Sequence, residues 1–401
     1  MKETNKLRIF ITIACISFLQ GLQFGPSPVL AQIQEHFSSV NTSLVQMLIT
    51  APSLVGMVFA VVSGILVTKI SKKKLLLIAA AVAFITGIIP YFFDSFPLLL
   101  AMRVVYGFAL GVSTALNTAV VAEWFEGDAR VIAMGVQSAS VGTGIAITTA
   151  GAGLLGAVKF TNSYFINFIG VLSFVLILIC LPETGVAKTD GDNQVRVNSR
   201  VFQIAFLGFL EYIFLISYTT NISMYVKETL SGSSSAAGTL TSIFSVAQII
   251  IGLLLGFLTG ITKKATLSTA MLSFALGALI LVLFPSSFPM MCIGSLLCGF
   301  SQGAFIPTAM VEVSNAVPPV AAAMASGVFT CFSCIGQLVS PFLLNAVCGA
   351  VFGEATAKNV FAVDVVGMVI AAAVAAYIML GPPAKKFAAK SKKKSNVIHL
   401  Q

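Results

Sequence analysis

Twelve apolar stretches, each about as long as a bilayer-spanning helix, limit what this chain can fold into. A helix needs about 20 mostly apolar residues to cross a membrane. The stretches occupy residues 9–31, 43–67, 75–93, 98–122, 131–156, 163–182, 201–225, 237–260, 267–284, 289–312, 322–347 and 360–381. Only 9% of the residues are charged, against about 25% in soluble domains, so a large soluble fold is excluded. The runs lack the short alternation of β-barrel strands, and we expect an all-α membrane protein of twelve transmembrane helices.

Lysine and arginine predict the orientation of these helices. With both termini in the cytoplasm, nineteen of the 23 basic residues fall on the cytoplasmic side and three on the outer side, namely Lys159, Lys227 and Lys358. Positive charge is retained on the cytoplasmic side of membranes, so we expect a multi-pass protein of the cell membrane with both termini inside. The basic tail AKKFAAKSKKKS is expected to contact anionic membrane lipids and not nucleic acid.

The longest polar stretch between the apolar runs, GVAKTDGDNQVRVNSR at residues 185–200, divides them six and six. This division predicts an N-terminal six-helix bundle at 1–184, a cytoplasmic linker at 185–200, a C-terminal six-helix bundle at 201–382 and a basic tail at 383–401. A shift of 192 positions aligns glycines of the two halves, in the pairs Gly64–Gly256, Gly107–Gly299 and Gly144–Gly336. Six helices per half give the copies the same orientation, which is the parallel-repeat architecture of many carriers.

Three motifs then resemble those of the major facilitator superfamily, over essentially the whole chain. GILVTKISKKK (residues 64–74) is similar to the loop signature between the second and third helices, LAMRVVYGFALG (100–111) to a fourth-helix motif, and LPETG (181–185) to the end of the sixth helix. The resemblance implies two six-helix bundles, a substrate site between them and transport by alternating access. It also implies a cytoplasmic gate formed by the loop signature and by charged residues near it. The expected gating residues are Gly64, Thr68, Lys69, Lys72, Lys73, Glu123, Asp128 and Arg130. Thr68 replaces the aspartate of the signature and cannot form its ion pair, so the gate is expected to be weaker or fastened elsewhere.

Glu211 is the one acidic residue in the apolar run FLGFLEYIFLISY, residues 206–218. It lies about 15 Å along a helix that begins near Val201, close to the bilayer midplane. A charged group there costs at least about 2.5 kcal/mol, unless it faces water or takes a proton. Glu211 is therefore a candidate for proton coupling, and the alternative is a protonated structural carboxyl. Glu312 and Asp364 lie near helix ends, where we expect them to be solvated.

Arg103 is the only basic residue within a predicted span. It could attract an anionic substrate, influence a nearby carboxylate or serve a structural role. In the family the arginine of this motif is linked to proton movement. A direct ion pair between Arg103 and Glu211 is left open, since the two residues differ in expected depth.

The family resemblance implies that the first, fourth, seventh and tenth helices line the cavity, with contributions from the second, fifth, eighth and eleventh. Polar side chains with aromatic neighbours in these spans suit a small amphipathic solute. The candidates for substrate binding are Gln20, Gln23, Phe24, Asn117, Gln137, Tyr218, Asn221, Gln248, Gln302, Phe305, Thr308 and Gln337.

No P-loop, metal-ligand set or nucleophile with a base occurs, so the chain is expected to be neither an enzyme nor an ATP-driven pump, and to need no cofactor.

FGPSPVLAQI (residues 24–33) resembles the first helix of drug–proton antiporters, which favours export, although the antiporter proline in the fifth helix is missing. We expect a proton-coupled carrier of small organic or amphipathic solutes that works as a monomer. An uptake symporter, a uniporter or organic-anion carrier anchored by Arg103, and a transport-inactive sensor remain as alternatives.

Overall fold

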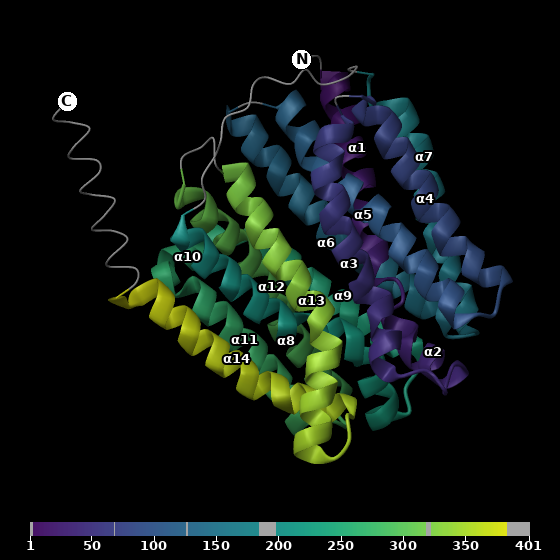
Figure 1. Cartoon of the computed structure of the whole chain (residues 1–401), viewed down its shortest axis with the longest axis vertical. Helices are drawn as coiled ribbons and strands as arrows, with labels where there is room; N and C mark the ends of the chain where they lie inside the picture. The colour runs from purple at the N-terminus through teal and green to yellow at the C-terminus, as the bar shows by residue number, and fades with distance from the viewer. Residues whose placement is uncertain (1–2, 68, 126, 184–197, 318–321, 383–401) are drawn as a thin grey trace.

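The computed structural model describes residues 3–67, 69–125, 127–183, 198–317 and 322–382, and these residues are helical with short connections (Figure 1). Within them, twelve helices are long and apolar enough to cross a membrane. The prediction of an all-α membrane fold with twelve spans is confirmed. Most of the linker 185–200, the tail 383–401 and Thr68 lie outside the described residues.

The first six spans are built from ten elements. They are α1 (Glu3–Gly21), η1 (Leu22–Phe24), η2 (Ser27–Val29), α2 (Leu30–His36), α3 (Thr42–Leu66), α4 (Lys72–Phe92), α5 (Phe96–Trp124), α6 (Gly127–Gly156), η3 (Phe160–Phe168) and α7 (Ile169–Cys180). Polar side chains begin two of these helices. Asn41 accepts from Ser43 N at the start of α3, and Ser71 accepts from Lys74 N at the start of α4. Such caps satisfy backbone donors that the first turn leaves free.

The last six spans are built from eight elements. They are α8 (Ser199–Leu230), α9 (Ser234–Leu253), α10 (Leu255–Thr262), η4 (Lys263–Ala265), α11 (Thr266–Leu283), α12 (Phe288–Asn315), α13 (Ala322–Phe352) and α14 (Ala357–Leu380). Asn198 caps α8 by accepting from Val201 N, and Thr356 caps α14 by accepting from Asn359 N. The predicted span 237–260 is divided at Leu254, which lies between α9 and α10.

The predicted span 9–31 is also divided, at Gly25 and Pro26. The α-helix ends at Gly21 and two short 3₁₀ turns follow before the helix resumes at Leu30. Pro26 and Pro28 lack the N–H that would continue an α-helix, and proline interrupts the regular hydrogen bonds of helices. The break frees backbone carbonyls near the middle of the first span, and the functional site uses them.

The helices form two bundles, with the N-terminal helices in purple to blue and the C-terminal helices in teal through green to yellow (Figure 1). We call the end that carries the connections 37–41, 93–95 and 157–159 the outer end, because the charge pattern predicts that it faces outward. Glycines let the bundles approach closely there. A Cβ on Gly153 of α6 would lie 2.7 Å from Ser234 O and 3.0 Å from Gly238 Cα of α9. Small residues permit such contact between membrane helices.

Two hydrogen bonds between the bundles join residues that are 192 positions apart. Ser27 Oγ donates to Thr219 O at 2.5 Å, and Ala31 N donates to Ser223 Oγ at 3.2 Å. Equivalent residues of two repeats can touch only near the axis that relates the repeats. The contacts therefore agree with the 192-residue offset found in the sequence, and they locate the pseudo-twofold axis beside the break in the first span.

Candidate functional site

Polar side chains from the first, second and eleventh spans meet at the middle of the interface between the bundles. Gln23 Nε2 donates to Ser53 Oγ at 2.7 Å and to Ile49 O at 3.1 Å. Ser53 Oγ in turn donates to Gln337 Oε1 at 2.7 Å, which links the two bundles. Gln23 and Gln337 were both predicted to bind substrate, and the structure brings them together through Ser53.

A second polar group joins the bundles closer to the outer end. Gln46 Nε2 of α3 donates to Asn221 Oδ1 of α8 at 2.7 Å. Asn345 Nδ2 of α13 lies 2.9 Å from Gln46 Oε1 and 2.9 Å from Ser43 Oγ. We call this set, Ser43, Gln46, Asn221 and Asn345, the outer amide cluster. Its members are uncharged. Gln46 and Asn221 each donate and accept, and Asn345 donates to two partners, so the cluster satisfies polar groups that would otherwise be buried alone.

Glu211 lies on α8 and is completely buried. Ser301 Oγ of α12 donates to Glu211 Oε1 at 2.7 Å, and Glu211 Oε2 is buried without a hydrogen-bond partner. An ionised carboxylate in such a position would lack a compensating charge. The arrangement can hold a proton on the carboxyl group and release it when water or a new partner reaches Oε2.

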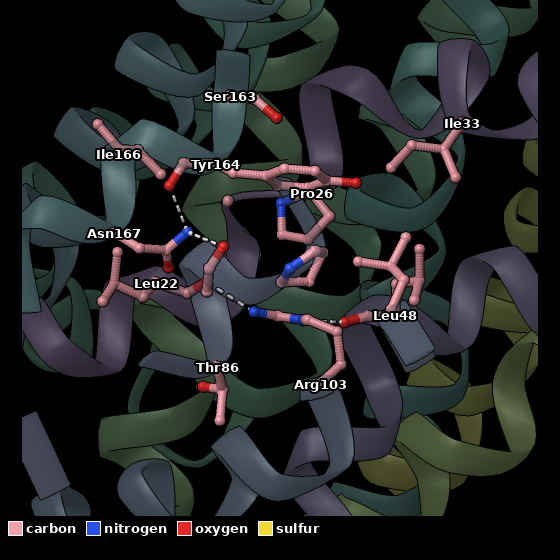
Figure 2. A pocket seen from close by; sticks show the side chains of 14 residues that line it. Leu22, Pro26, Ile33, Leu48, Thr86, Arg103, Ser163, Tyr164, Ile166 and Asn167 are labelled. Atoms are coloured by element: carbon pink, nitrogen blue, oxygen red, sulfur yellow. Dashed lines mark hydrogen bonds between the residues drawn. The ribbon is translucent and has the colours of Figure 1, made fainter. Parts of the chain in front are cut away.

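Arg103 of α5 faces the break in the first span and lines a small pocket of about 30 Å³ (Figure 2). Its Nε donates to Leu48 O at 2.7 Å, one terminal nitrogen donates to Leu22 O at 3.3 Å, and the other donates to Gln23 O. Pro52 and Pro26 follow Leu48 and Leu22 by four residues and lack the N–H groups that would bond these carbonyls in a continuous helix. Arg103 therefore supplies donors where prolines removed them.

Other contacts of Arg103 are also local. Its guanidinium carbon lies 4.9 Å from the ring centroid of Tyr106, whose hydroxyl donates to Leu19 O. No ion pair joins Arg103 to Glu211, both of which the structure describes. The direct ion pair between Arg103 and Glu211, which the sequence left open, is therefore absent from this conformation of the described residues.

Replacing Arg103 with methionine is expected to destabilise the protein by about 3 kcal/mol, because it removes charged donors from buried carbonyls. The thermal unfolding temperature of the purified protein in detergent measures this effect. Lys69→Met is the matched control, since Lys69 is exposed. Equal unfolding temperatures for the two variants would contradict the structural role of Arg103.

The other predicted substrate residues occupy several positions. In the N-terminal bundle, Gln20 Nε2 donates to Ser113 O, Asn117 Nδ2 to Ser17 Oγ and Gln137 Nε2 to Thr118 Oγ1, while Phe24 is half-buried. In the C-terminal bundle, Gln302 and Thr308 are largely buried, Gln248 is half-buried, and Phe305 is fully buried. Tyr218 is enclosed in its own bundle, where its hydroxyl lies 2.6 Å from Ser295 Oγ and 3.1 Å from Leu240 O. These residues do not form one continuous cluster with Gln23 and Gln337.

The expected gating residues lie around the start of α4 and the end of α5. Lys72 Nζ is 2.9 Å from Glu123 Oε2, and this ion pair joins two helices of the same bundle. Gly64 and Lys69 are exposed, and Lys73 is half-buried. Thr68 and the side chains of Asp128 and Arg130 lie outside the described residues. A role of these residues in gating stays a prediction.

The expectation for Asp364 is wrong. This carboxyl is fully buried because α14 already begins at Ala357, so Asp364 lies about two helical turns inside the span. Sequence reasoning also missed Gln46, Ser53 and Asn345. Pro52 in the same helix was an available signal, since an interrupted helix often marks functional backbone in a transporter.

Comparison with known proteins places this architecture in a family. The sequence profile of the Major Facilitator Superfamily matches residues 9–201 and 204–400. The chain belongs to this superfamily. It is therefore a membrane transporter and not an enzyme. No curated protein matches the chain at a significant level.

Solved transporters share the fold at low sequence identity. A bacterial homologue of the human lysosomal transporter Spinster, in an inward-facing and occupied conformation, superposes with a TM-score of 0.75 at 15% identity, covering 94% of this chain and 97% of that one. The POT family transporter PepTSo gives 0.76 at 9% identity, with 95% and 98% covered. A D-xylose–proton symporter gives 0.69 at 16% identity, with 91% and 96% covered. These similarities extend over the whole fold.

Proposed function

We propose that the protein is a proton-coupled carrier of a small amphipathic solute, and that Glu211 exchanges the coupling proton. The observation that carries the proposal is the environment of Glu211: complete burial, one bond from Ser301 and a second oxygen without a partner. Proton coupling needs a group whose protonation changes with its exposure to water. The D-xylose–proton symporter named above supports this choice only as a proton-coupled protein of similar fold.

The joined outer end supports an alternating-access cycle. In the described part of the chain, the hydrogen bonds between the bundles run from Ser53 to the outer end and include the outer amide cluster. A carrier that is closed on the outside would receive solute from the inside. Export is the direction that we propose, on the resemblance of FGPSPVLAQI to the first helix of drug–proton antiporters.

Unpaired amide oxygens support a neutral or cationic solute with hydrogen-bond donors. Asn117 Oδ1, Gln137 Oε1 and Gln248 Oε1 are buried without hydrogen-bond partners. A solute that donates to such oxygens would replace the bonds that they lack. The alternative of an organic-anion carrier needs a free Arg103, whereas each of the three guanidinium nitrogens of Arg103 already bonds to a backbone carbonyl.

A thermal-shift screen tests this function in the purified protein. A panel of neutral, cationic and anionic amphipathic solutes is measured at one acidic and one alkaline pH. We expect a neutral or cationic solute to stabilise the protein with a strength that changes between the two pH values, because binding and protonation of Glu211 are linked. A shift that anionic solutes alone produce, equally at both pH values, would contradict the proposal and favour the carrier anchored by Arg103.

A further inference from the structure

A second buried carboxyl, Asp364 of α14, lies outside the mechanism proposed for Glu211. It is fully buried, and Asp364 Oδ1 has no hydrogen-bond partner. Its other oxygen, Oδ2, contacts the hydroxyl of Ser217 on α8. Ser217 is six residues beyond Glu211, whose own contact is Ser301 of α12. The two carboxyls therefore have different partners on different helices.

The two hydrogen bonds of the Ser217 hydroxyl indicate the protonation state of Asp364. Ser217 Oγ lies 2.6 Å from Phe214 O and also within hydrogen-bonding distance of Asp364 Oδ2. A hydroxyl has one proton to donate, and a carbonyl and an ionised carboxylate both only accept. Both contacts are full hydrogen bonds at once only when Asp364 carries a proton and donates it to Ser217 Oγ. In that arrangement Ser217 donates its own proton to Phe214 O.

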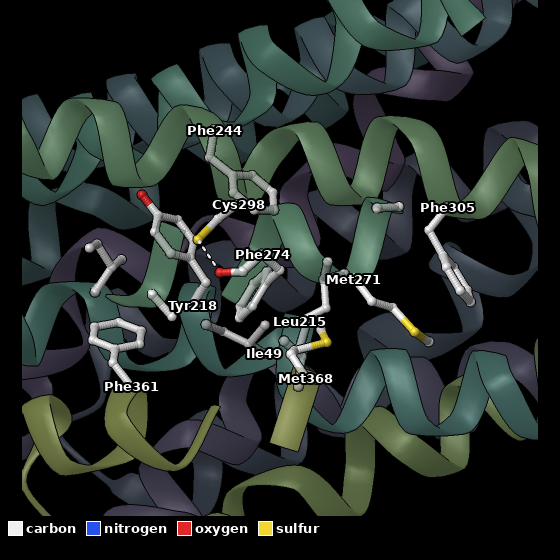
Figure 3. Close-up of a cluster of buried hydrophobic side chains, with 14 of the residues drawn as sticks. Ile49, Leu215, Tyr218, Phe244, Met271, Phe274, Cys298, Phe305, Phe361 and Met368 are labelled. Atoms are coloured by element: carbon white, nitrogen blue, oxygen red, sulfur yellow. Dashed lines mark hydrogen bonds between the residues drawn. The ribbon is translucent and has the colours of Figure 1, made fainter. Parts of the chain in front are cut away.

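Among the residues that the structure describes, Asp364 forms no ion pair. The titratable groups near it are the thiols of Cys298 and Cys348 and the phenol of Tyr218, whose ring packs against Phe361 on α14 (Figure 3). Glu211 of α8 lies near the same thiol of Cys298. None of these groups supplies a positive charge.

Apart from Glu211 on α8, the charged side chains of the neighbouring elements that the structure describes lie toward the ends of α14. The sequence of α11, residues 266–283, has no ionisable side chain. At the two ends of α14, Glu228 accepts from Ala357 N and Arg200 donates to Ile378 O, while the lysines of η4 belong to the inner end. An ionised Asp364 would thus be a buried and unpaired charge, which is costly in this environment.

Hydrogen bonds connect Asp364 to the interface between the bundles. Asn221 Nδ2 donates to Ser217 O at 2.9 Å, and Asn221 Oδ1 accepts from Gln46 Nε2 of the other bundle. Two residues after Ser217, the carbonyl of Thr219 accepts from Ser27 at the pseudo-twofold axis. The residue that contacts Asp364 therefore belongs to the same turns of α8 that close the outer end.

We propose that Asp364 is a second proton-binding site, and that its proton holds the outer interface between the bundles closed. When the proton leaves, the carboxylate requires water or a new donor, and Ser217 must turn from Phe214 O toward Asp364. This change loosens the turns of α8 that carry Asn221 and Thr219, and it favours the open interface. The inference goes beyond the proposed function, since it does not depend on Glu211 or on the identity of the solute.

The test measures the width of the outer interface as a function of pH. Spin labels on non-canonical amino acids at Val158 and Glu354, both exposed in outer connections of different bundles, report this distance by double electron–electron resonance and leave Cys298 and Cys348 in place. In the wild type, the long-distance population is expected to rise from acidic to alkaline pH. Asp364→Asn keeps the shape of the side chain and cannot ionise. Over the same change of pH, its ratio of open to closed populations is expected to change at least about tenfold less than that of the wild type.

Two further variants separate this inference from the proposed function. Glu211→Gln should keep the pH response of the distance, because Asp364 and Ser217 remain. Ser217→Ala should weaken the response while it preserves both carboxyls, and it serves as the second variant if Asp364→Asn is unstable. A wild-type-like pH response in Asp364→Asn, or a response that Glu211→Gln alone removes, would overturn the proposal. A pH-independent distance in the wild type would also overturn it.

Discussion

Glu211→Gln is expected to lower proton-driven accumulation of the solute by at least about tenfold, because glutamine has nearly the shape of glutamic acid and cannot exchange a proton. The measurement uses the purified protein in liposomes with an imposed pH gradient, with a solute that the thermal-shift screen identifies. Glu211 Oε1 accepts from Ser301, and a glutamine oxygen can accept the same bond. The variant therefore changes the protonation chemistry with little change in packing.

Counterflow of labelled against unlabelled solute is the internal control for this variant. Exchange does not require net proton movement, so Glu211→Gln should retain it. Ser301→Ala is the matched control, since it removes the contact to Oε1 and leaves the carboxyl able to exchange protons. Accumulation by Glu211→Gln that follows the pH gradient as in the wild type would exclude Glu211 as the coupling group.

Gly153→Val is expected to reduce transport by at least about tenfold, because the outer end can no longer close fully. The added Cβ would meet Ser234 O at 2.7 Å and Gly238 Cα at 3.0 Å. Both are backbone atoms of α9, which cannot rotate away as a side chain could. The distance between spin labels at Val158 and Glu354 should lengthen together with the loss of transport.

The matched control is Gly349→Val, in the outer part of α13. In the described part of the chain, and apart from the backbone of its own helix, no atom lies within 4 Å of a Cβ at Gly349. This substitution should therefore leave the interface and the transport rate nearly unchanged. Equal distances and equal rates in the Gly153 and Gly349 variants would show that the contact of α6 with α9 does not limit the cycle. A lower unfolding temperature for both variants would identify a general packing defect instead.

Hydropathy alone predicted the twelve spans, because a helix in lipid must be apolar over a fixed length. The offset of 192 positions found from the glycines is also the offset between the residues that touch at the pseudo-twofold axis. Gly107 and Gly299 lie at close helix contacts within their own bundles, whereas a Cβ at Gly64 or Gly256 would meet no described neighbour within 4 Å. The breaks at Pro26 and Leu254 were not predicted. A hydrophobic window averages over such local backbone changes, and tertiary contacts such as those of Arg103 stabilise them.

The site was less accessible to sequence reasoning than the fold. The position of Glu211 well inside a span followed from one acidic residue in a long apolar run, although its complete burial did not. The error for Asp364 came from placing the start of its helix only a few residues too late. The outer amide cluster joins residues up to 302 positions apart, from Ser43 to Asn345. Sequence spacing does not reveal which face of one helix meets which face of another when nearly all faces are apolar.

The uncharged nature of the outer interface has a consequence for how the carrier responds to its medium. Apart from the exposed pair of Lys227 with Glu35, the contacts described between the bundles are bonds among amides, hydroxyls and backbone groups. Dissolved ions screen charged pairs strongly and neutral hydrogen bonds hardly at all. We therefore expect ionic strength to act on the closed outer interface mainly through the pair of Lys227 with Glu35, and only weakly through its neutral hydrogen bonds.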